Sequence, residues 1–302
     1  MSGIMSLRGV WQILRLPLFV TAVADVVSGY VVGLLPELDR FDWREASLLA
    51  GTSAGLYLFG MVENDLRDIR RDRVISPSRP LITGRMSVAG AVILLLLSLG
   101  LAVACAGTMH GGALVLAILT FAAINLYNLG AKYGPPAVAM SVMGLCRMLN
   151  FGMGVAAAAG LPRELHLDLF SLSGPLWVRQ GLALFFITII ITGYSICVRG
   201  GIRVSTRPWR AAFVATAMAG FAMLALSVWG EPAGPHLGAP VARGFAGLLL
   251  ASLWPGGLWS AAGHERGPEE YGPFIERALY WFIVLDVAFV ADGWLMNLAA
   301  SR

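Results

Sequence analysis

The stretch MVENDLRDIRRDR, residues 61–73, places three aspartates and four arginines directly after a run of apolar residues. If it continues the preceding helix at about 100° per residue, four oxygen-bearing side chains fall within an arc of roughly 100°: Asn64, Asp65, Asp68 and Asp72. Carboxylates on one face repel one another unless a cation joins them, and hard oxygen ligands together with substrate phosphates suit Mg²⁺. The pattern predicts a magnesium and diphosphate site. A solvated helix end with ordinary intrahelical ion pairs is the alternative.

The composition around this stretch is that of a membrane protein. The chain has 302 residues, of which 57% are hydrophobic and 13% charged, and its mean hydropathy is +0.73. A soluble domain carries about 25% charged residues, so the predicted solvent is a lipid bilayer. The net charge of +4 belongs to loops, which argues against nucleic acid as a partner. Cys105, Cys146 and Cys197 show no metal-ligand spacing and are expected to be buried thiols.

Apolar runs separated by polar breaks predict one all-α integral membrane domain over residues 1–302, a bundle of about nine transmembrane helices. The candidate spans are 10–35, 46–64, 87–107, 112–131, 136–160, 180–198, 210–229, 242–262 and 273–299. Lys and Arg gather after every second span, so the positive-inside rule places the N-terminus in the cytoplasm. The expected cytoplasmic loops are about 64–86, 132–136, 199–209 and 263–272.

Further polar groups can complete a site for an anionic substrate. The loop SPSRPLITGRMS, 76–87, carries Arg79 and Arg85, whose forked donors can hold phosphate or anchor the loop to lipid headgroups. Polar residues within spans usually face the bundle interior. Arg147 is predicted to pair with Asp25, either beside the substrate or as a purely structural pair. The small residues of GMGVAAAAG, 152–160, allow close helix packing.

The run NDLRDIRRD, 64–72, resembles the first aspartate-rich motif, NDxxDxxxD, of the UbiA superfamily of intramembrane prenyltransferases, and RPL at 79–81 with GR at 84–85 matches the element that follows it. The resemblance implies a multi-pass enzyme, here expected in the bacterial inner membrane. It binds a prenyl diphosphate through Mg²⁺ at the cytoplasmic face and transfers the prenyl group to an unknown acceptor. It implies catalytic and metal-binding roles for Asp65, Asp68 and Asp72, with Asn64 beside them. The predicted substrate-binding residues are Arg71, Arg79, Arg85, Asn125, Tyr127, Lys132, Arg147, Asn150, Arg199 and Arg203.

The sequence departs from that family where a second aspartate-rich motif is expected. The segment TGYSICVRGGIRVSTRPWR, 192–210, contains no Asp or Glu, so Arg199 and Arg203 either bind diphosphate directly or only set topology. This absence, with LRLPLFVTAVADVVSGY at 14–30 and the stretch 128–154, resembles the EboC-like branch, whose members accompany gene clusters for export or maturation of secondary metabolites. The alternatives to a transferase are a UbiA-type terpene cyclase and a non-catalytic membrane carrier or scaffold for such export.

Overall fold

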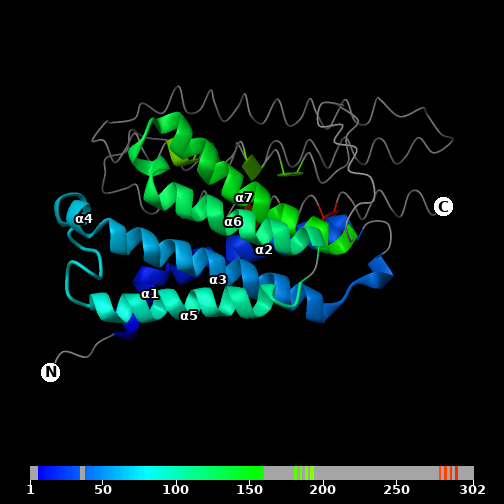
Figure 1. The fold of residues 1–302 in the computed structure, drawn as a ribbon, viewed down its shortest axis with the longest axis horizontal. Coiled ribbons are helices and arrows are strands. Elements are labelled where there is room, and N and C mark those ends of the chain that lie inside the picture. Colours follow the sequence, from blue (N-terminus) through cyan, green and yellow to red (C-terminus); the bar gives the residue numbers. More distant parts are fainter. Residues whose placement is uncertain are drawn as a thin grey trace.

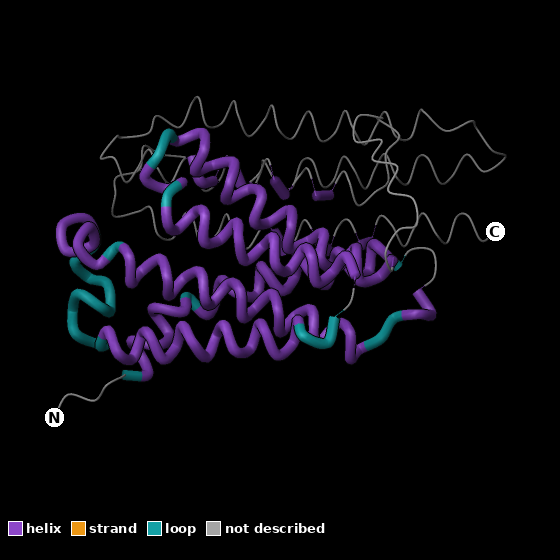
Figure 2. Tube along the Cα trace, in the orientation of Figure 1, coloured by secondary structure: helices purple, strands orange, loops and turns teal. Residues whose placement is uncertain are grey.

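The computed structural model describes residues 6–34, 38–109 and 111–159, and a few further positions between 180 and 193 and between 279 and 291. These residues form helices and turns without a strand, in agreement with the predicted all-α fold (Figure 2). The elements are α1 Leu7–Leu14, α2 Leu16–Gly33, η1 Leu38–Arg40, α3 Trp43–Arg67, α4 Ile69–Ile75, α5 Val88–Ala106, α6 Gly111–Leu129, η2 Ala131–Tyr133 and α7 Pro136–Ala159.

Five of these helices, α2, α3, α5, α6 and α7, correspond to the first five predicted spans. Within the described residues, Val88–Ala106, Gly111–Tyr133 and Pro136–Ala158 are long and apolar enough to cross a membrane. The pair α1 and α2, bent by 46°, makes a fourth candidate. The helix α3 is less apolar, because Gly, Ser and Thr interrupt its larger side chains. The predicted spans 180–198, 210–229, 242–262 and 273–299 lie wholly or largely outside the described residues.

The side chains of α5 show which surface meets lipid. Val92, Ile93, Leu96 and Leu97 are exposed on one side, whereas small residues such as Ala91 are buried on the other. A broad exposed apolar surface is rare on soluble monomers, but it is what a bilayer requires of a spanning helix. The chain is therefore an integral membrane protein.

The helices α2 and α7 approach each other backbone to backbone. A Cβ atom built on Gly154 of α7 would lie 2.0 Å from the carbonyl oxygen of Val26. One built on Gly29 of α2 would lie 2.2 Å from the carbonyl oxygen of Phe151. Side chains larger than hydrogen at these positions would push the helices apart, so the two glycines set their spacing, as small residues commonly do between membrane helices.

The charged stretch lies at one end of this bundle. In Figure 1, α4 and the turn between α6 and α7 are found at the end where the N-terminus also lies. The predicted continuous helix is interrupted at Asp68 (φ −87°, ψ 5°), which separates α3 from α4. Helical hydrogen bonds nevertheless cross the break, because the Asp68 N–H donates to the Asn64 carbonyl (3.0 Å) and the Asp72 N–H to the Asp68 carbonyl (2.7 Å). The helical spacing of the carboxylates is therefore retained.

Candidate active site

The three aspartates of the charged stretch turn inward. Asp65 and Asp68 are each 4% exposed and Asp72 is 6% exposed. The arginines of the same stretch are all exposed: Arg67, Arg70, Arg71 and Arg73. A buried carboxylate needs a cation or several hydrogen-bond donors, because burial removes the water that stabilises its charge. The neighbours of the three carboxylates supply these groups.

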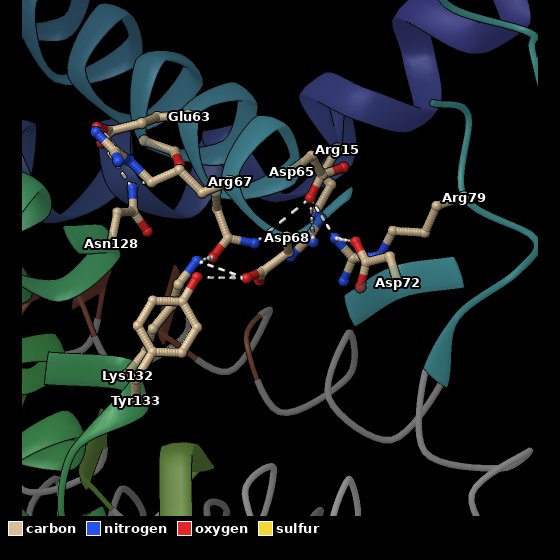
Figure 3. Close-up of polar contacts among 12 residues, drawn as sticks. Arg15, Glu63, Asp65, Arg67, Asp68, Asp72, Arg79, Asn128, Lys132 and Tyr133 are labelled. Carbon is tan, nitrogen blue, oxygen red and sulfur yellow. Dashed lines mark hydrogen bonds and ion pairs between the residues drawn. The ribbon is translucent and has the colours of Figure 1, made fainter. Parts of the chain in front are cut away.

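Arg79, on the loop after α4, joins two of the carboxylates (Figure 3). Its Nη1 contacts Asp65 Oδ1 and lies 3.2 Å from Asp72 Oδ2. The Arg15 guanidinium approaches the same Asp65 oxygen, at 3.4 Å. Arg15 lies at the junction of α1 and α2 and adopts the left-handed conformation, with φ of 47°. That bend brings a cation from the first helix pair to the end of α3.

Asp68 has a separate set of partners, which come from η2. The Lys132 ammonium lies 3.1 Å from Asp68 Oδ1 and donates to Asn64 Oδ1 at 2.9 Å. The Tyr133 hydroxyl donates to Asp68 Oδ1 at 2.7 Å, as Figure 3 shows. Asp65, Asp68 and Asp72 thus face three cations: Arg15, Arg79 and Lys132. We call these six residues the carboxylate cluster; it is balanced in charge.

The predicted trio of metal ligands is therefore divided. Among the residues that the structure describes, no three His, Cys, Asp or Glu side chains gather closely enough to hold a metal ion. Arg79 lies between Asp65 and Asp72, and Asp68 is turned to Lys132 and Tyr133. The donor atoms still suit magnesium, because Asp65 and Asp72 already converge on a single positively charged nitrogen. These two carboxylates fit a divalent ion in the place that Arg79 occupies.

A cavity of about 240 Å³ extends from this cluster into the bundle. Arg15 and Asn64 line it on the side of the cluster, and Tyr127 and Asn128 of α6 add further polar groups. Its apolar lining comes from several helices and includes Leu18, Leu56, Ile124, Met143, Ile191 and Leu279. An apolar chamber with a charged rim is suited to a molecule with an anionic head and a hydrocarbon tail.

The remaining predicted substrate-binding residues divide between the cavity and other places. Tyr127, Arg147 and Asn150 line the cavity. Arg71 is exposed, and it lies close enough for its positive charge to repel that of Lys132. Arg85 donates to Gln12 Oε1 at 3.2 Å and so lies against α1, and it is not among the residues that line the cavity.

Asn125 does not reach the cavity either. Its Nδ2 donates to the Phe121 carbonyl at 2.8 Å, one turn earlier in α6, which is a local contact rather than a substrate-facing one. Arg199 and Arg203, with the acid-free segment 192–210 to which they belong, lie outside the described residues apart from its first two positions. Their predicted roles remain predictions.

Sequence reasoning missed two polar residues that build this end of the molecule, Arg15 and Tyr133, and proposed no site role for a third, Asn128. Arg15 was signalled only by its place at the start of the first apolar segment. Tyr133 adjoins Lys132 in a loop already predicted to be cytoplasmic. Asn128 donates to Glu63 Oε2 (2.9 Å) and to the Gly60 carbonyl (3.0 Å), and it thereby ties α6 to α3. No spacing rule links residues so far apart along the chain.

The fold and site define a class: a helical membrane protein whose apolar chamber ends in a buried cluster of acidic and basic groups. The sequence matches the UbiA prenyltransferase family over residues 26–266, and the chain belongs to this family. The EboC-like branch within it stays a prediction.

Solved structures of UbiA homologues share the fold. One from Aeropyrum pernix K1 is 20% identical, with a TM-score of 0.62 over 92% of this chain and 98% of its own. One from Archaeoglobus fulgidus, bound to DMAPP and Mg²⁺, is 15% identical, with a TM-score of 0.58 over 93% of this chain and 99% of its own. A digeranylgeranylglyceryl phosphate synthase structure is 16% identical, with a TM-score of 0.53 over 95% and 98%. No curated protein matches this sequence.

Proposed function

We propose that this chain is a Mg²⁺-dependent prenyltransferase that binds a prenyl diphosphate with its head at the carboxylate cluster and its hydrocarbon tail in the cavity. The observation that carries the proposal is the buried cluster of Asp65, Asp68 and Asp72, whose partners Arg15 and Asn64 line an apolar chamber. Homologous structures bound to DMAPP or GPP together with Mg²⁺ support it. The proposed product is a prenylated acceptor.

The residues of the cluster take distinct roles in this proposal. Asp65 and Asp72 would hold Mg²⁺, while Arg79, Arg15 and Lys132 bind the phosphate oxygens. Bound magnesium supplies positive charge against the negative charge that develops on diphosphate as the allylic C–O bond breaks. The cavity wall would keep water from the allylic carbon, because most of its surface is apolar.

The charge balance of the cluster also orders the binding events. Three cations already neutralise three carboxylates, so a divalent ion alone gains little there and must displace Arg79. A diphosphate adds negative charge to which Arg79 and Lys132 can turn, which releases the carboxylates. We therefore expect metal and diphosphate to bind together rather than metal first.

Calorimetry with an unreactive substrate analogue tests the proposal. We expect geranyl thiodiphosphate to bind the purified protein in the presence of Mg²⁺ and to bind at least tenfold more weakly without it. The double variant Asp65→Asn/Asp72→Asn should lose the Mg²⁺-dependent binding. Asp39→Asn, at an exposed carboxylate of η1, is the matched control and should bind normally. Unchanged binding by a folded double variant would remove the metal-site assignment.

A further inference from the structure

A second polar group lies deep in the same cavity. Asp25 and Arg147 line its wall, and Asp25 is ten residues, or about 15 Å of helix, beyond Arg15 in the chain. The Arg147 guanidinium pairs with Asp25 Oδ2 and donates to the hydroxyl oxygen of Thr21 (2.7 Å) and to its carbonyl oxygen (3.2 Å). The Phe282 ring covers the guanidinium, 4.1 Å from its central carbon. A charged side chain is thus held rigidly at membrane depth.

Another carboxyl group completes this deep site. Asp286 accepts a hydrogen bond from Gln180 Nε2 at 3.0 Å, and the same amide nitrogen donates to the Ser28 hydroxyl at 2.5 Å. Ser28 follows Asp25 by about one turn of α2, so the two Gln180 hydrogen bonds bring the Asp286 carboxyl group beside this turn. Asp25 is 0% exposed and Asp286 is 2% exposed. Among the described residues, Asp25 Oδ1 and Asp286 Oδ2 have no hydrogen-bond partner when both groups are ionised.

The charges around Asp25 and Asp286 favour a single proton bound between them. Among the described residues, Arg147 is the cation in contact with these two carboxyl groups. Two ionised carboxylates beside one guanidinium would leave a net negative charge inside a bilayer, where unbalanced charge costs several kcal/mol. One proton between Asp25 Oδ1 and Asp286 Oδ2 makes the group neutral. It also gives both unpartnered oxygens a hydrogen bond.

We propose that Asp25 and Asp286 share one proton, and that the neutral group they form with Arg147 binds an uncharged hydrogen-bonding group, such as a hydroxyl, of the second substrate. Arg147 lines the cavity, its side chain is 12% exposed, and it supplies the hydrogen-bond donor for the ligand. An ionised ligand group would restore the unbalanced charge and is disfavoured. This assignment rests on the proposed function only in naming the ligand as the prenyl acceptor, whose reactive end would then face the carboxylate cluster.

Infrared spectroscopy tests the shared proton directly. At pH 8, where exposed carboxyl groups are ionised, we expect the wild type to show a protonated-carboxyl C=O band that shifts on exchange into D₂O. Asp286→Asn should remove this band and keep the fold, because the amide imitates a protonated carboxyl group. Asp39→Asn should retain it. A wild type without the band, or a band that survives Asp286→Asn, overturns the proposal.

The binding site is tested with small probes of one shape. By ligand-observed NMR, the wild type should bind benzyl alcohol at least tenfold more tightly than toluene, and it should bind benzoate worst. The double variant Asp25→Leu/Arg147→Met should fold, because apolar residues of similar volume commonly replace buried ion pairs without loss of stability. It should lose the preference for the alcohol. Equal binding of benzyl alcohol and toluene by the wild type overturns the site.

These outcomes are separable from those of the proposed function. Asp286→Asn should leave Mg²⁺-dependent binding of geranyl thiodiphosphate at the carboxylate cluster unchanged within about twofold. Loss of diphosphate binding in the wild type, with benzyl alcohol still preferred, would refute the prenyltransferase and keep the deep site. The reverse pattern would keep the prenyltransferase and refute the deep site.

Discussion

Arg79 lies between the two carboxylates to which the proposed function assigns Mg²⁺. Its Nη1 contacts Asp65 and Asp72, the two carboxylates that are best placed to hold Mg²⁺ in our proposal. The same guanidinium has forked donors that suit diphosphate. In the proposed function, Arg79 would therefore oppose metal binding before the substrate arrives and favour substrate binding afterwards.

We expect Arg79→Gln to separate these two effects. Without the guanidinium, Asp65 and Asp72 lose a shared cation, so Mn²⁺ alone should bind at least tenfold more tightly than to the wild type. Geranyl thiodiphosphate should bind at least tenfold more weakly in saturating Mg²⁺, because a phosphate contact is lost. Electron paramagnetic resonance measures free Mn²⁺, and calorimetry measures the analogue. Arg73→Gln, at an exposed arginine of the same stretch, should change neither value.

At the scale of helices, the arrangement depends on two close approaches and on one interrupted helix. The contact of α2 with α7 holds Asp25 against Arg147, and residues of both helices line the cavity. The break at Asp68 changes the direction of the chain while the hydrogen bonds of Asp68 and Asp72 continue the helical pattern. Helix packing therefore places the carboxylate cluster beside the cavity and the Asp25–Arg147 pair in its wall.

A methyl group at the tightest contact should disturb this packing. Gly154→Ala introduces a Cβ that would lie 2.0 Å from the Val26 carbonyl oxygen and 2.6 Å from the Tyr30 nitrogen. Because backbone atoms cannot rotate away, we expect a loss of about 1–3 kcal/mol or more and a lower melting temperature in detergent. Gly100→Ala in α5 meets nothing within 4 Å and should be neutral or slightly stabilising. Equal melting temperatures for the two variants would contradict the close approach.

For the whole molecule, the proposed ionisation of a prenyl diphosphate does not decide whether an acceptor or the prenyl chain itself captures the cation. A transferase and a cyclase of this family can share the ionisation step and differ in what captures the allylic cation. With geranyl diphosphate, Mg²⁺ and no acceptor, we expect purified protein to yield no cyclic hydrocarbon by gas chromatography and mass spectrometry. A cyclic terpene made without acceptor would replace the transferase by the cyclase alternative, and no binding of diphosphate at all would favour the carrier.

The orientation of the bundle is a further prediction for the whole molecule. The basic residues after every second span predict that the carboxylate cluster faces the cytoplasm. Ser78 is exposed on the loop after α4, so Ser78→Cys in a background without the native cysteines should react with an impermeant maleimide only after the inner membrane is opened. Trp43→Cys, at the exposed start of α3 at the opposite end, should react in intact spheroplasts. The reverse pattern would invert the topology.

Local sequence predicted much of this protein because the information was local. Apolar run length placed four spans within a few residues of α3, α5, α6 and α7, whereas the first predicted span, 10–35, ran across the bend between α1 and α2. The spacing of Asp65, Asp68 and Asp72 placed them on one face because a helix repeats every 3.6 residues. The motif 64–72 with the RPL element indicated the family that the match over residues 26–266 establishes. Period, hydropathy and motif spacing all lie along the chain.

The tertiary structure alone decided which charges meet. Arg79 pairs with Asp65 across 14 residues, Lys132 binds Asn64 across 68, and Arg147 binds Asp25 across 122. The sequence predicted the last pair and left open whether it serves the substrate, but it gave no sign that Asp286 and Gln180 would lie beside it. Electrostatic attraction acts through space, and only helix packing brings these residues within its short effective range. For this reason the sequence identified the acidic residues, but only the folded bundle determined which cations balance them.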